Sequence, residues 1–262
     1  MEHSIIENRP GAATNIAIQA AMNSSPDGYT LAYVSSANAI NATLYEKLPF
    51  NFPRDIAPVA SLIRQPLVMV VNPSFPAKTV AKLVAYAKAH PGTISMASFG
   101  TGTSSHLAGE LFKTMTGLNM IHVPYRGEAP ALTDLLGGQV QVFLGASGSI
   151  EPIRAGRLRA LAVTTAERTA ALPDIPTMSD FVPGYEASSW SGVGVPKGTP
   201  PEIIERLNRE INAGLVVPAI KARFIELATT PTVSTPTEFG TFMTAETEKW
   251  GKVVKASGAK PD

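Results

Sequence analysis

The chain has 262 residues, of which 44% are hydrophobic and 16% charged, and its formal net charge is +1. This composition excludes a disordered chain, and the nearly neutral charge argues against a nucleic-acid binder or a polybasic membrane binder, since both need a concentrated positive field. The chain has no cysteine, which excludes disulfides, thiolate chemistry and cysteine-ligated metals. No apolar run approaches the roughly 18 residues of a membrane span, so we expect a globular protein that is not embedded in a membrane.

Short apolar runs alternate with amphipathic segments along the chain. This alternation predicts an α/β fold with parallel sheets and helices on their faces. Seven apolar runs bounded by turn residues predict buried strands at 29–34, 67–71, 93–97, 120–123, 140–144, 158–163 and 192–195.

Helices are predicted between these strands from apolar spacing and end signals. Thr199-Pro200-Pro201-Glu202 and Thr235-Pro236-Thr237-Glu238 each have the pattern of a capping box with proline in the first turn. The predicted helices follow Thr79 and end at Pro91-Gly92, cover 107–115 and 131–136, and begin at Thr199 and Thr235.

Two turn-rich segments, near 72–76 and near 182–185, are candidates for chain crossings between two lobes of a hinged protein. They divide the chain into a first lobe of 1–71 plus 188–262 and a second lobe of 72–187. On pattern alone, either segment can also be an ordinary surface loop.

A glycine-containing loop follows the strand predicted at 93–97 and precedes a helix. Its glycines allow a sharp turn, and the amides at the helix start are typical of a site for a carboxylate or phosphate. The alternative is a capped helix after a tight turn. No lysine follows the second glycine and no third glycine is present, so this is neither a P-loop nor a dinucleotide fingerprint. The candidate binding residues are Ser98, Gly100, Thr101, Gly102, Thr103 and Ser104.

Three more junctions between strands and loops have small polar residues, and ligands of open α/β sheets bind at strand ends. Arg126 suits a bidentate carboxylate contact, although a solvated loop charge is the alternative. Together these junctions predict a cleft lined by hydroxyls and amides. Their candidate residues are Ser35, Ser36 and Asn38, then Tyr125, Arg126 and Gly127, then Ala146 and Ser147.

The sequence predicts no catalytic residue, no metal site and no cofactor. None of the four histidines has metal-ligand spacing, and no G-x-S-x-G nucleophile elbow occurs. Ser104 and Ser105 adjoin His106, but neighbours on a helix face different directions. An α/β enzyme acting on a small acid is therefore the less favoured alternative to a binding protein.

Seven segments, in order over nearly the whole chain, carry a resemblance to a known family. They are Glu7-Asn8-Arg9-Pro10-Gly11-Ala12, Pro26-Asp27-Gly28-Tyr29-Thr30-Leu31, the glycine loop 98–107, His122-Val123-Pro124-Tyr125-Arg126-Gly127, 134–140, 172–177 and Glu248-Lys249-Trp250. Together they resemble the substrate-binding proteins of tripartite tricarboxylate transporters, the Bug-type family.

The resemblance implies a two-lobed fold like that of type II periplasmic binding proteins, in which each lobe is a mainly parallel sheet flanked by helices. It further implies a periplasmic protein that closes on a small carboxylate, which can be a di- or tricarboxylate, an aromatic acid or an amino acid. The implied partners are the membrane permease subunits of the transporter. The alternative output is docking on a membrane sensor.

One departure from the family pattern lies at the start of the chain. Family members have a strand, a Pro-Gly-Gly loop and a helix before the segment that begins here at Glu7, and only six residues precede it. The resemblance therefore implies that this chain lacks that strand and helix, and its first residues have no secretion-signal pattern. A missing strand would leave neighbouring strand edges exposed.

Overall fold

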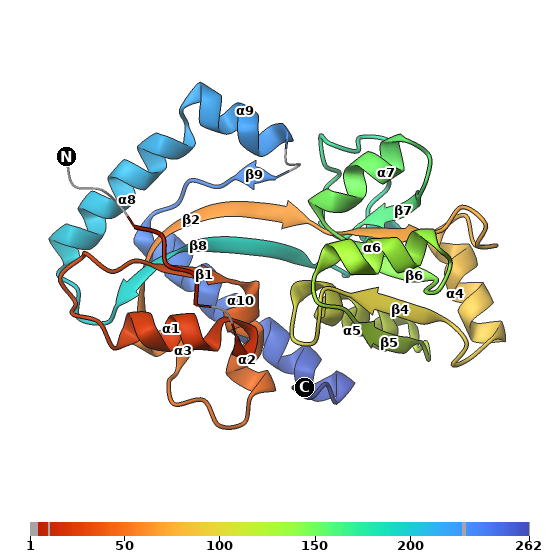
Figure 1. Ribbon diagram of the computed structural model, residues 1–262, viewed down its shortest axis with the longest axis horizontal. Helices are drawn as coiled ribbons and strands as arrows, with labels where there is room; N and C mark the ends of the chain where they lie inside the picture. Colours follow the sequence, from red (N-terminus) through yellow and green to blue (C-terminus); the bar gives the residue numbers. More distant parts are fainter. Residues whose placement is uncertain (1–4, 10, 227–228, 262) are drawn as a thin grey trace.

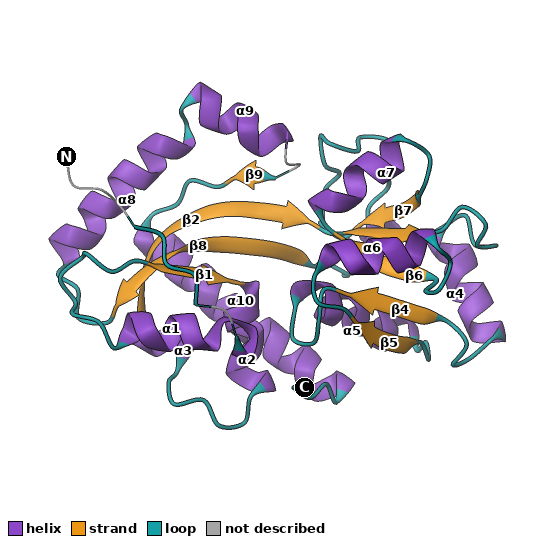
Figure 2. Cartoon of the chain, in the orientation of Figure 1, coloured by secondary structure: helices purple, strands orange, loops and turns teal. Residues whose placement is uncertain are grey.

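The computed structural model describes residues 5–9, 11–226 and 229–261, and its fold is α/β with two sheets and surrounding helices (Figure 1, Figure 2). The four-stranded sheet has the order β1-β8-β2-β9 and the five-stranded sheet the order β5-β4-β6-β3-β7. We call the parts built on these sheets the first lobe and the second lobe. The strands are β1 (Ala32–Ser35), β2 (Ile56–Pro66), β3 (Val68–Val71), β4 (Ser95–Ser98), β5 (Ile121–Pro124), β6 (Val142–Gly145), β7 (Arg159–Val163), β8 (Ser188–Pro196) and β9 (Thr230–Pro231).

Each of the seven predicted strands overlaps an observed strand, but the longest strand, β2, was not predicted. Its sequence contains Pro58 and Pro66, which remove backbone donors and are unusual inside a paired strand. Register shifts between Pro58 and Ala60 and between Ser61 and Ile63 accommodate this irregular strand in the sheet. A two-lobed α/β fold was expected and is confirmed.

The direction of the strands differs from the prediction of mainly parallel sheets. Every described strand pair of the first lobe is antiparallel. In the second lobe β4 is parallel to β5 and β6, whereas β3 is antiparallel to β6 and β7. The cause is that β2 leads out of the first lobe and β8 leads back, so two strands that pair along their length run in opposite directions (Figure 1).

The chain passes between the two sheets at Leu67 and again before Ser188. Thr164 joins these two passages: its amide donates to the Leu67 carbonyl at 2.9 Å and its carbonyl accepts from the Ala187 amide at 2.9 Å. The Thr164 hydroxyl also donates to the Leu67 carbonyl at 3.0 Å. β3 follows directly and pairs in the second lobe, so the predicted boundary after residue 71 falls four residues beyond this passage.

Helices flank both sheets, and the long α10 packs on α2 and β2 and extends to α5 of the second lobe (Figure 1). Within the described residues, no helix combines the length and apolar character needed to cross a bilayer. The helices are α1 (Asn15–Met22), α2 (Ser36–Leu44), α3 (Phe52–Asp55), α4 (Val80–Ala89), α5 (Ser104–Thr116), α6 (Glu128–Leu136), α7 (Ile150–Arg154), α8 (Pro201–Leu215), α9 (Pro218–Glu226) and α10 (Pro236–Ser257), with 3-10 turns η1 (Ala12–Thr14), η2 (Ser147–Ser149) and η3 (Met178–Asp180).

Two of the three predicted helix caps are confirmed. Thr79 caps α4, and Thr235 forms with Glu238 the capping box of α10. The cap predicted at Thr199 is wrong. α8 begins at Pro201 without a side-chain cap, and the Thr199 hydroxyl instead donates to the Pro196 carbonyl at 2.8 Å.

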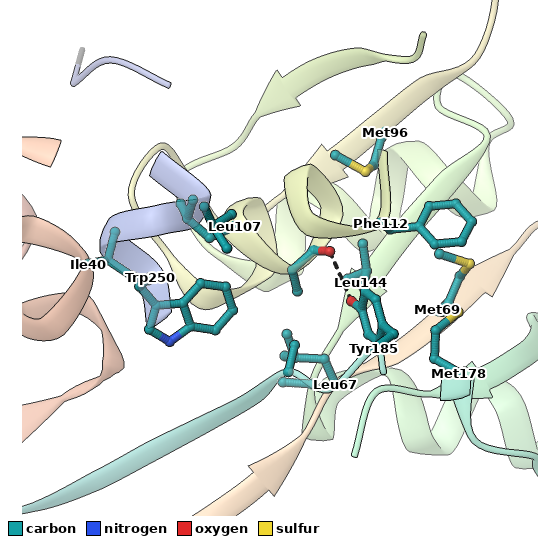
Figure 3. Close-up of a cluster of buried hydrophobic side chains, with 14 of the residues drawn as sticks. Ile40, Leu67, Met69, Met96, Leu107, Phe112, Leu144, Met178, Tyr185 and Trp250 are labelled. Atoms are coloured by element: carbon teal, nitrogen blue, oxygen red, sulfur yellow. Dashed lines mark hydrogen bonds between the residues drawn. The ribbon is translucent and has the colours of Figure 1, made fainter. Parts of the chain in front are cut away.

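One hydrophobic core runs from the first lobe into the second (Figure 3). Ile40 of α2 and Trp250 of α10 belong to the same buried cluster as Leu107 of α5 and Tyr185. The Tyr185 hydroxyl donates to the Ala108 carbonyl at 2.9 Å, which ties the segment before β8 to α5 (Figure 3). This shared core brings the start of α5 close to the first lobe.

Candidate functional site

The loop from β4 to α5 makes the sharp turn that its two glycines predict. Gly100 and Gly102 have φ angles of +133° and +78°, which L side chains rarely adopt. Thr103 is the N-cap of α5: its hydroxyl donates to the Gly100 carbonyl at 2.7 Å and accepts from the His106 amide at 3.4 Å. The predicted tight turn into a capped helix is therefore confirmed.

The start of α5 has backbone amides that the helix itself does not satisfy. The first amides of a helix have no acceptor within it, and the Thr103 cap satisfies only the amide of His106. The amides of Ser104 and Ser105 thus need an acceptor from outside the helix. The Ser105 hydroxyl donates to the Leu144 carbonyl at 2.7 Å and fixes this end of α5 to β6. The helix dipole favours a negative group at this end.

Two stacked histidines lie under the loop. The ring centroids of His106 and His122 are 3.8 Å apart, with their planes inclined by 9°. His106 Nδ1 accepts from the Gly102 amide at 3.2 Å, and His122 Nε2 lies 2.7 Å from Ser98 Oγ. Ser98 Oγ also accepts from the Gly100 amide at 3.1 Å. Both glycine amides are therefore tied to a histidine, one directly and the other through a serine.

Ser98 and His122 have the hydroxyl and the imidazole that a nucleophile and its base would need. The sequence could not reveal this pair, because the two residues are 24 positions apart. Ser98 is 0% exposed, and its hydroxyl is engaged with His122 and with the Gly100 amide. The two side chains hold the glycine loop through the Gly100 amide. In the part of the chain that the structure describes, no three histidine, aspartate or glutamate side chains gather into a metal site.

Burial lowers the pKa of His106, and repulsion from His122 and Lys113 lowers it further, from the usual 6.5 to about 3. The residue is only 4% exposed. Because the Gly102 amide donates to Nδ1, this nitrogen carries no proton, which places the ring proton on Nε2. Neutral His106 is thus part of the loop's hydrogen bonding.

We expect the free energy of unfolding to fall as the pH drops below about 6.5, because the unfolded chain then binds a proton at His106 that the folded chain refuses until about pH 3. Each pH unit in this window should cost about 1.4 kcal/mol. Urea denaturation at several pH values measures the slope. His106→Asn should flatten it and His90→Asn, at an exposed histidine, should not; an unchanged slope in His106→Asn would contradict the assignment.

The second predicted loop adjoins the glycine loop. The amides of Tyr125 and Gly127 donate to the carbonyls of Ser98 and Phe99 at 3.1 and 3.0 Å. The Tyr125 hydroxyl donates to Asp134 at 2.6 Å, and burial together with this bond raises the pKa of Tyr125 to about 12. The tyrosine hydroxyl is thus engaged with α6. Arg126, at the tip of the same loop, is exposed.

The loop after β6 already holds a carboxylate of the chain itself. Glu128 accepts from the amides of Ala146 and Gly148 at 2.7 and 3.2 Å and from the Ser149 hydroxyl at 3.1 Å. A ligand contact at Ala146 or Ser147 therefore stays a prediction, and it would have to coexist with Glu128 or displace it. The arrangement shows that the chemistry of this loop suits a carboxylate.

The first-lobe candidates lie where β1 passes into α2. Ser35 is the N-cap, and its amide donates to Asn38 Oδ1 at 2.8 Å. Asn38 Nδ2 donates to the Thr14 hydroxyl at 2.7 Å. Both ends of the Asn38 amide are therefore engaged within the chain, and Ser36 is buried beside it at the first position of α2.

Sequence reasoning missed Asn15 and Asn41. Asn41 Nδ2 donates to the Ala13 carbonyl at 2.6 Å and to Asn15 Oδ1 at 3.1 Å, which fixes the orientation of both amides. Asn15 Nδ2 and Asn41 Oδ1 then remain buried without a hydrogen-bond partner. An unpaired buried polar atom costs about 1–3 kcal/mol. No sequence signal marks these two residues, because their pairing depends on how η1 and the first residue of α1 meet α2.

The backbone before α1 is strained at the same place. Ala12, Ala13 and Thr14 have φ angles of +44°, +47° and +79°, at a cost of about 1–2 kcal/mol per residue. The hydrogen bonds from Asn41 to Ala13 and from Asn38 to Thr14 hold this conformation. Strain maintained by buried polar side chains is typical of functional sites.

The glycine loop meets α2 across the lobe contact. A Cβ atom placed on Gly102 would lie 2.7 Å from Leu44 Cδ2 and 3.4 Å from Asn41 Oδ1. A side chain at position 102 would therefore have to displace the Leu44 side chain of α2. The structure therefore brings together the glycine loop, the Tyr125–Gly127 loop and the polar side of α2.

Comparison with known proteins identifies this architecture. Residues 2–259 match the family described as "Tripartite tricarboxylate transporter family receptor". The protein BugT of Bordetella pertussis is 38% identical over 260 residues, which cover 98% of this chain and 80% of BugT.

Two solved structures extend the comparison. Rpa4515 of R. palustris, solved with adipate, has a TM-score of 0.88 and 36% identity, covering 98% of this chain and 87% of that one. MatC of Rhodopseudomonas palustris, solved with bound malate, has a TM-score of 0.82 and 26% identity, covering 93% and 85%. This chain belongs to the family of tripartite tricarboxylate transporter receptors.

Proposed function

We propose that this protein is a periplasmic solute-binding protein that captures a small carboxylate between its two lobes and delivers it to the permease of a tripartite tricarboxylate-type transporter. The ligand shifts the protein toward a closed form by contacting both lobes. The output is binding and release without chemical change.

The observation that supports the proposal is the position of the N-terminus of α5, which directly follows the Gly102 contact with α2 of the first lobe. A carboxylate suits this position because helix N-termini and turn amides favour anions. Adipate and malate in the related structures are dicarboxylates, which supports the same ligand class here.

The proposed ligand contacts are the glycine loop, with Thr101 and Ser104 foremost, Arg126 of the next loop, and Ser35 and Ser36 of the first lobe. Arg126 can reach a ligand carboxylate from the exposed tip of its loop, and a second carboxylate needs such a cation or further amides. The proposed lobe boundaries are the Leu67 passage and the junction before Ser188.

Titration of the purified chain with adipate, malate and an aromatic carboxylate tests the proposal. At a concentration of about 100 times the dissociation constant, a bound acid should stabilise the fold by about 2.7 kcal/mol and raise Tm by several degrees. Thr101→Phe should abolish the shift by filling the loop, whereas Thr114→Phe, at an exposed position of α5, should keep it. A cooperatively folded protein that no carboxylate stabilises would contradict the proposal.

A further inference from the structure

Two histidines take part in the hydrogen bonds of the glycine loop. His106 Nδ1 accepts from the Gly102 amide, and His122 Nε2 contacts the Ser98 hydroxyl that accepts from the Gly100 amide. The two rings stack at 3.8 Å. Without His106 the Gly102 amide would lose its acceptor, and without His122 the Ser98 hydroxyl that accepts from the Gly100 amide would lose its imidazole partner.

We propose that His106 and His122 are positioning residues, which set the conformation of the glycine loop before a ligand arrives and thereby raise carboxylate affinity. The inference rests on the proposed function for its ligand, but the loop conformation can be measured without one. Because the Gly102 amide donates to His106, it is not available to a carboxylate. The amides that remain for a carboxylate are those at the start of α5.

The charges around His106 favour its neutral form. Glu110 Oε1 lies 3.8 Å from His106 Nε2, but Lys113 bonds the same carboxylate oxygen at 2.7 Å and offsets its charge. His122 of β5 faces the ring, and Tyr185, packed on the other side of α5, bonds the Ala108 carbonyl. A proton on Nδ1 would remove the acceptor of the Gly102 amide, so acid should release the loop only near pH 3, where folded His106 takes up a proton.

Substitutions at His106 separate the acceptor from the ring. In His106→Asn the side-chain oxygen takes the place of Nδ1 as an acceptor, whereas His106→Leu has none. We expect amide hydrogen exchange of residues 99–104 in the ligand-free protein to quicken about tenfold or more in His106→Leu and to stay within about threefold in His106→Asn. His90→Asn is the matched control at an exposed histidine and should behave as wild type.

Titration with adipate or malate supplies the binding readout. At neutral pH, His106→Leu should lose about tenfold in affinity and His106→Asn about threefold or less. Because folded His106 stays neutral until about pH 3, the ratio of wild-type affinity to His106→Asn affinity should stay constant from neutral pH down to about pH 5. Dividing the two affinities at each pH removes the ionisation of the ligand itself.

Loop exchange in His106→Leu that matches wild type would overturn the inference. If His106→Leu has no cooperative unfolding transition, His106→Asn is used instead: exchange of residues 99–104 that quickens about tenfold in this variant, which keeps an acceptor, would also overturn the inference. A wild-type protein that binds none of the carboxylates would contradict the proposed function, while the exchange measurement would still decide the role of His106.

Discussion

Replacing Glu246 by alanine should lower the free energy of unfolding by about 3–5 kcal/mol, because one buried carboxylate oxygen accepts two hydrogen bonds. Glu246 Oε2 accepts from Trp190 Nε1 at 3.0 Å and from Trp250 Nε1 at 2.9 Å. Glu246 is 6% exposed and both indoles are buried, so alanine would leave two N–H groups without acceptor or water. Urea denaturation followed by fluorescence measures the loss directly, since these are the chain's two tryptophans.

Two variants make this prediction specific. Glu246→Gln keeps an acceptor of the same length and should recover part of the stability, since a neutral acceptor binds more weakly than a charged one. Glu248→Ala removes an exposed glutamate from the same helix and should change stability by about 0.5 kcal/mol or less. Equal losses in Glu246→Ala and Glu248→Ala would show that the indole bonds contribute nothing.

The same carboxylate connects the helix that spans the lobes with the strand that returns from the second lobe. Lys249, one turn from Glu246, bonds Glu186 just before β8 begins and lies 3.4 Å from Glu246. Tyr185, the preceding residue, contacts α5. α10 is thus anchored at the passage between lobes, where a change in lobe angle has to be absorbed.

Local patterns in the sequence were sufficient for most of the fold. The apolar runs locate seven strands, and Thr79 and Thr235 mark helix starts, because both signals arise within a few residues. β2 was not predicted because its prolines suggest a loop and because its partners in the sheet, β8 and β9, lie far along the chain. The direction of the strands was also not predictable from local patterns, because it follows from how β2 and β8 pass between the lobes.

The candidate site was predictable only where it is continuous in sequence. The glycine loop, with its turn and N-cap, follows from Gly100, Gly102 and Thr103. The roles of His106 and Asn41 do not, because the partners that define them come from other elements and 26 positions separate Asn41 from Asn15. That Glu128 occupies the loop after β6 was likewise invisible, since an exposed loop glutamate has the same local pattern.

Gly102→Ala should weaken carboxylate binding about tenfold or more while leaving each lobe folded, because the added methyl group would keep the lobes apart. Its Cβ would lie 2.7 Å from Leu44 Cδ2, and Leu44 is 3% exposed, so the leucine would have to shift within a packed contact. Titration with the carboxylate that stabilises wild type measures the loss. Small-angle scattering of the liganded protein should show a larger radius of gyration than that of liganded wild type.

The methyl group also meets an unfavourable backbone conformation, and a matched control separates that effect. Gly138→Ala has nearly the same φ angle, +76° against +78°, and nothing within 4 Å of the new Cβ, so it should share the stability loss of about 1 kcal/mol and keep wild-type affinity. Adding Leu44→Ala to Gly102→Ala should restore binding above that of Gly102→Ala alone. Such coupling would identify the Leu44–Gly102 contact as the one that closes the lobes, whereas additive losses would place the closing contact elsewhere.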